Sequence, residues 1–133
     1  LMYVFLTRGC ETLFVSPTCT PWGSNSNTWS KEKRRKARMD QTMSLQFIAV
    51  LCFLQVGLGR AYIIERPHGS VMMSESPLSH LSVLPQETAS SDQCCFEAKL
   101  QDEGLIKKNT CFDSNVPLPE LNKKCDGTHD HIP

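Results

Sequence analysis

The chain has 133 residues, of which 40% are hydrophobic, and its 14 basic and 14 acidic side chains give a formal net charge of zero. This neutrality conceals two segments of opposite charge: residues 1–43 carry seven basic and three acidic side chains, whereas residues 62–133 carry six basic and eleven acidic ones. The acidic balance of residues 62–133 argues against nucleic acid and anionic membrane surfaces as partners of that segment.

Residues 1–42 show no helical or strand periodicity, and Cys10 and Cys19 lie there without motif spacing. The basic run at residues 31–38 (KEKRRKAR) matches a nuclear-localisation or nucleic-acid patch, and it equally fits a long cytosolic flank of a signal sequence. No aromatic platform or second basic cluster accompanies it, so nucleic-acid binding is not predicted. We expect residues 1–42 to be untranslated or discarded.

Residues 45–59 (LQFIAVLCFLQVGLG) form the most apolar stretch of the chain. It is shorter than the roughly 20 apolar residues of a membrane span and contains Gln46 and Gln55, whereas a secretory signal needs a core of only about 7–15 residues. The small-residue triplet that ends at Ala61 provides a cleavage site. We therefore predict a signal peptide over residues 43–61, a secreted extracellular product and no stable membrane span; a signal-anchor and a buried core helix are the two alternatives.

Residues 62–91 contain three prolines, seven serines and only scattered apolar side chains. Such a composition buries too little surface to offset its ordering entropy, which predicts a largely disordered lead-in. A propeptide or a partner-binding segment is the alternative interpretation.

The four cysteines that follow are Cys94, Cys95, Cys111 and Cys125, an even number typical of a disulfide framework in a short secreted segment. A bond between Cys94 and Cys95 is disfavoured by its geometry, which leaves two possible connectivities. Capping residues before Cys94 and a glycine at position 104 predict a helix over residues 91–103, and a proline at position 119 predicts a second over residues 119–124. The expected fold is thus a small, disulfide-rich, mainly α module over residues 92–133, with two short helices joined by disulfides.

Two metal-site interpretations compete with the disulfides. Structural zinc sites favour paired ligands two to four residues apart, whereas these cysteines are adjacent or separated by fifteen and thirteen residues. The segment 126–131 (DGTHDH) alternates histidine and carboxylate like a metal-binding tail, but it also fits a frayed polar terminus. We predict no metal or cofactor, and because no catalytic triad, carboxylate pair or phosphate loop occurs, no enzymatic activity.

The spacing from Cys94-Cys95 through Cys111 to Cys125, with the approach VPLPELNKKC, resembles the first four cysteines of an anaphylatoxin-like module of the fibulin and complement type. The chain departs from that family because it ends at Pro133 without the closing Cys-Cys pair, so the resemblance implies a truncated module. Within that family's pairing, Cys94 would join Cys125, and Cys95 and Cys111 would lack partners. The implied function is a structural or interaction module of an extracellular matrix protein that binds matrix or receptor proteins; the alternative is a complete small secreted ligand, such as a signalling peptide, toxin or defence factor.

Overall fold

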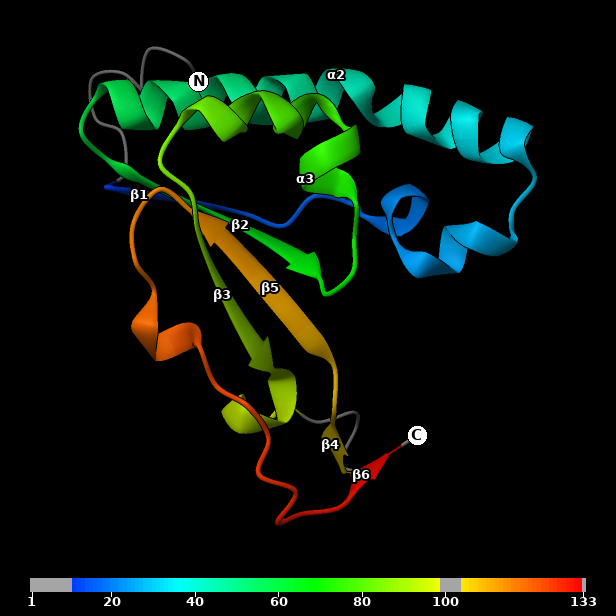
Figure 1. Cartoon of the computed structure of the whole chain (residues 1–133), viewed down its shortest axis with the longest axis vertical. Helices are drawn as coiled ribbons and strands as arrows, with labels where there is room; N and C mark the ends of the chain where they lie inside the picture. Colours follow the sequence, from blue (N-terminus) through cyan, green and yellow to red (C-terminus); the bar gives the residue numbers. More distant parts are fainter. Residues whose placement is uncertain (1–10, 99–103, 133) are drawn as a thin grey trace.

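The computed structural model describes residues 11–98 and 104–132 and contains a four-stranded mixed sheet beneath one long helix (Figure 1). The strand order is β1-β2-β5-β3; β1 and β2 are parallel, and the other neighbours are antiparallel. The strands of this sheet are β1 (Thr12–Val15), β2 (Ala61–Pro67), β3 (Glu87–Asp92) and β5 (Asn109–Ser114). A second, two-stranded sheet pairs β4 (Leu105–Ile106) with β6 (His131–Ile132) in parallel.

The long helix α2 (Lys31–Gly57) contains both the basic run and most of the apolar stretch. It begins where the Ser30 hydroxyl accepts a hydrogen bond from the Lys33 amide, and the chain leaves it through Gly59, whose φ of 68° suits glycine. Its inward face is buried through Leu45, Ala49 and Cys52. These side chains join one hydrophobic core with residues of β2, which places α2 over the β1–β2 side of the sheet.

Two short 3-10 helices, η1 (Thr20–Trp22) and η2 (Ser24–Thr28), connect β1 to α2. They carry the buried Trp22, whose indole nitrogen donates to Gln41 of α2 at 2.9 Å. Of the described helices, α2 alone is long and apolar enough to cross a membrane, although 22% of its apolar window is buried and core helices or signal sequences meet the same criterion.

The prediction of a disordered lead-in over residues 62–91 is wrong. This segment forms β2, the helix α3 (Met72–Glu75), the 3-10 helix η3 (Pro77–Val83) and β3. Its apolar residues are scattered in sequence but converge in space, and those with no exposed surface are Tyr62, Ile64, Met72, Leu78 and Leu81. They pack in one core with side chains of α2. The prediction of disorder treats α2 as a cleaved signal, and without α2 these side chains would lack that core.

The predicted helix over residues 91–103 is also wrong within the described residues. β3 extends to Asp92, and only the 3-10 helix η4 (Gln93–Phe96) follows, ending at Glu97 in the left-handed region with φ 59°. Pairing of β3 with β5, with Ser90 opposite Cys111, overrides the local capping signals. The end of the predicted helix, residues 99–103, lies outside the described residues. The second predicted helix is reduced to one turn, η5 (Pro119–Leu121).

The expected fold class, a small mainly α module held by disulfides, is therefore wrong: the described chain is a mixed α/β fold. Every cysteine that the structure describes is a free thiol, and these are Cys19, Cys52, Cys94, Cys95, Cys111 and Cys125. A helix on a sheet buries its own core, so this fold does not require the disulfides that a forty-residue module would need.

An ion pair inside the sheet joins β2 to β5. The Arg66 guanidinium donates to both carboxylate oxygens of Asp113, at 2.6 and 3.3 Å, and the Thr88 hydroxyl of β3 donates to Asp113 at 2.7 Å. The Asp113 side chain is only 6% exposed, so this network connects three strands in a largely desolvated position.

Candidate metal centre

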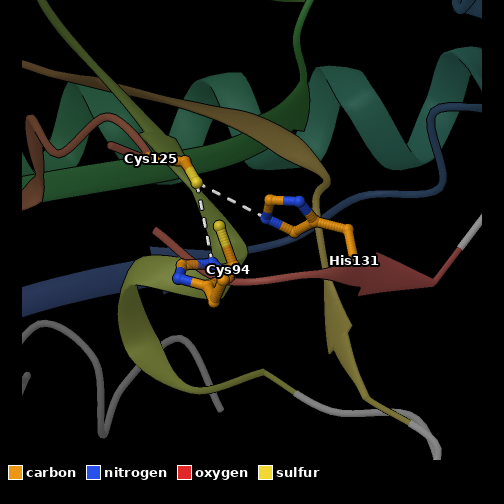
Figure 2. A group of neighbouring side chains, drawn as sticks. Cys94, Cys125 and His131 are labelled. Carbon is orange, nitrogen blue, oxygen red and sulfur yellow. Dashed lines mark hydrogen bonds between the residues drawn. The ribbon is translucent and has the colours of Figure 1, made fainter. Parts of the chain in front are cut away.

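Four potential metal ligands from two distant segments meet at the end of the sheet far from α2. They are the thiols of Cys94 and Cys125 and the imidazoles of His129 and His131, and their ligand atoms all lie within 4.8 Å of one another. Figure 2 shows the sulfur of Cys125 directed at the His131 ring, with the sulfur of Cys94 beside it. Cys94 is buried, and the other three are half-buried.

The two distances from the Cys125 sulfur to the imidazoles fit tetrahedral coordination. The Cys125 sulfur lies 3.6 Å from His129 Nε2 and 3.4 Å from His131 Nε2. With zinc–sulfur and zinc–nitrogen bonds of about 2.3 and 2.0–2.1 Å, a tetrahedral angle places sulfur and nitrogen about 3.6 Å apart. The position of Cys125 relative to each ring is thus the one that a shared zinc ion requires.

Asp92, the last residue of β3, fixes the approach of the tail to the cluster. Its carboxylate accepts hydrogen bonds from the Cys125 amide and the Asn109 side chain, each at 2.9 Å, and its own amide donates to the Lys123 carbonyl at 3.0 Å. The Cys125 amide is the main cause of the lowered pKa of Asp92, followed by Asn109. Asp92 is therefore an ionised anchor two residues before Cys94.

The tail reverses direction after Cys125 so that both histidines return to it. The Asp126 carboxylate accepts from the amide and the hydroxyl of Thr128, at 3.0 and 2.7 Å, which closes a turn. Gly127 has a φ of 76°, a left-handed conformation that favours glycine, and its amide donates to the Cys125 sulfur at 3.3 Å. His129 and His131 are two residues apart, and their rings meet edge to face with centroids 4.7 Å apart.

The main and small sheets together hold the two ligand segments in register. Cys94 lies in η4 directly after β3, and His131 begins β6, where it stands opposite Leu105 of β4. The Ile106 amide of β4 in turn donates to the Ala98 carbonyl behind η4 at 2.9 Å. Burial, and next the neighbouring Cys125 thiol, raises the pKa of Cys94 to about 11, so this sulfur keeps its proton unless a cation displaces it.

The structure separates the four disulfide candidates. Cys94 and Cys125 lie together in the cluster, whereas Cys95, half-buried, is not one of its ligands. Cys111 is buried in β5, with its sulfur 3.6 Å from His68 Nδ1 at the end of β2.

Ala61, the predicted cleavage residue, is the first residue of β2 and receives a hydrogen bond on its carbonyl from the Gln55 side chain at 2.9 Å.

The sequence indicates the cysteines and the DGTHDH tail, which contains His129 and His131, as two separate metal-site candidates, and no metal is predicted from either. What sequence reasoning missed is that His129 and His131 converge with Cys94 and Cys125. The signal that links them is the spacing Cys125-x3-His129-x-His131, which places three ligands within seven residues.

Comparison of the chain with family models, curated proteins and solved structures found no match.

Proposed function

We propose that this protein binds one zinc ion through Cys94, Cys125, His129 and His131, and that the ion fastens the C-terminal tail to the end of β3. The observation that carries the proposal is the convergence of two thiols and two imidazoles within 4.8 Å. Sulfur and nitrogen ligands favour zinc, whereas magnesium and calcium select oxygen. Binding releases one proton from each thiol, and the two thiolates then balance the charge of the ion.

The number of protein ligands favours a structural ion. Catalytic zinc sites have three protein ligands and keep an open position for water, whereas four Cys and His ligands close the coordination sphere. The hydrogen bonds of Cys125 with Asp92 and Gly127 provide the outer support that such sites use to orient their ligands. The prediction that the chain is not an enzyme agrees with a closed site and stays a prediction.

The test is metal stoichiometry of the full chain purified under reducing conditions. Elemental analysis should give one zinc per chain, and replacement with Co²⁺ should produce the visible absorption of a tetrahedral site with thiolate ligands. Cys94→Ser and His131→Ala should each lower zinc affinity by at least about tenfold, the lower end of what loss of a supporting partner alone costs. Cys95→Ser is the matched control and should keep full affinity, because Cys95 neighbours a ligand but lies outside the cluster.

Three outcomes would contradict zinc binding. One is a chain that takes up no zinc; another is uptake that Cys94→Ser leaves unchanged; the third is a Cys94–Cys125 disulfide that persists in the reduced, zinc-supplied protein. That last pairing is the one implied by the anaphylatoxin-like resemblance.

Secretion and an extracellular interaction role also stay predictions, since they depend on cleavage at Ala61 and not on the metal centre.

A further inference from the structure

The outward face of α2 carries a row of exposed apolar side chains. Their exposed fractions range from 37% at Phe53 to 80% at Met43, and the full row is Met39, Met43, Phe47, Val50 and Phe53. The spacing of four, four, three and three residues keeps them on one side of the helix, roughly opposite the buried Leu45 and Cys52. The row is about 21 Å long at 1.5 Å per residue.

The N-terminal end of the same helix borders a basic hollow of about 460 Å³. Four of its eight lining residues are basic and one is acidic, and Met39 belongs to both the hollow and the apolar row; the lining is Trp22, Lys31, Arg34, Arg35, Arg38, Met39, Thr42 and Glu75.

Two arginines of the hollow differ in their engagement with the protein. Arg38 is held by the Pro21 carbonyl at 3.0 Å, by the Glu75 carboxylate at 2.7 Å and by the Trp22 ring 4.5 Å beneath its guanidinium. Arg34, in contrast, has a buried Nε without a hydrogen-bond partner among the described residues. A buried donor on a cation without an acceptor is costly, so a turn of the Arg34 side chain that brought Nε to an anionic oxygen in the hollow would relieve that cost.

We propose that α2 docks the protein on an anionic membrane surface, with a lipid phosphate group in the hollow and the apolar row in the headgroup boundary. A basic end and a row of Phe, Val and Met on one helix face are the properties of helices that lie in the membrane interface. The inward face of α2 stays on the sheet, so the helix lies along the membrane and does not cross it. A second copy of the chain is the alternative occupant of the apolar row, and the basic lining of the hollow favours the anionic surface.

The experiment measures binding of the full chain to vesicles of phosphatidylcholine alone and of phosphatidylcholine with about a third phosphatidylserine. We expect binding to the anionic vesicles only, weakening as salt is raised. Phe47→Glu and Phe53→Glu should each lower the vesicle partition coefficient by about tenfold or more, and Arg34→Gln by severalfold. Phe14→Ser is the matched control: Phe14 is 56% exposed on β1, where Leu13 and Val15 point to the core, so it faces away from α2. Circular dichroism checks that each variant folds.

Several results would overturn the proposal. Equal binding to neutral and anionic vesicles would show that the basic hollow does not contribute to binding. Full vesicle binding by the Phe→Glu variants would show that the apolar row does not contribute. Protein that stays with the vesicles after an alkaline carbonate wash would indicate a span. Dimers without vesicle binding would assign the row to a second copy, and binding of inorganic phosphate without vesicle binding would assign the hollow to a free anion.

Discussion

Replacement of Leu45 by alanine tests whether α2 belongs to the folded protein. Leu45 is 1% exposed and lies in a core cluster shared with Trp22, Tyr62 and Met72. Removing a buried leucine side chain costs about 2–5 kcal/mol, because apolar contacts are lost and a cavity remains. The neighbours of Leu45 come from separate elements of a packed core and have little freedom to collapse, so we expect a loss of about 3 kcal/mol.

The assay is urea unfolding of the full chain followed by circular dichroism. With a denaturant slope of about 2 kcal/mol per molar urea, Leu45→Ala should lower the midpoint by about 1.5 M without changing the slope. Met43→Ala, two residues earlier on the same helix but 80% exposed, should change stability by no more than about 0.5 kcal/mol. Equal effects of the two substitutions would refute the packing of α2 on the sheet and favour the signal-peptide interpretation.

Three further predictions follow from the same fold. Burial raises the pKa of the Cys52 thiol from 9.0 to about 12. At pH 8, mass spectrometry should therefore find Cys95 alkylated and Cys52 unmodified until the chain unfolds. The free energy of unfolding should fall as pH rises above 9, because the thiol ionises first in the unfolded chain. Asp113→Asn should cost about 3–5 kcal/mol in urea unfolding, because it leaves Arg66 without its counter-charge, and a change below 1 kcal/mol would contradict this. If Ala61 marks a used cleavage site, the intact mass of a secreted product should lack α2; a product that retains α2 would disprove the signal peptide.

Local patterns in the sequence identified segments but not their tertiary partners. The apolar run at residues 45–59 was recognised, and a core helix was one of its alternatives, but the choice depended on what lay opposite it. β3 (ETASSD) shows no apolar alternation. Two of its buried residues, Ser91 and Asp92, are polar, and their side chains are satisfied by hydrogen bonds with the tail. A strand whose interior side chains are polar carries no periodicity signal, so the serines and aspartate of β3 resemble the N-cap of a helix.

The candidate metal centre shows the same division between local and long-range information. Cys125, His129 and His131 are close in sequence, but the local pattern indicates only the DGTHDH tail, without Cys125, as a metal-binding candidate. Cys94 lies 31 residues before Cys125, and only the pairing of β3 with β5 and the docking of the tail on Asp92 bring it to the cluster. No rule of spacing predicts that juxtaposition.

The uneven distribution of the core explains why a metal would stabilise this end of the molecule. No described residue from 115 to 131 is buried, so this tail is held to β3 by polar contacts, among them that of the Ser91 hydroxyl with the Leu121 carbonyl and that of the Lys124 ammonium with Ser90 at 2.8 Å. Such hydrogen bonds contribute about 0.5–1.5 kcal/mol each, and exposed ones can be replaced by water. A zinc ion at 100 times its dissociation constant adds about 2.7 kcal/mol. Chelation should therefore release the tail while α2 and the four-stranded sheet remain folded, which hydrogen exchange can resolve segment by segment.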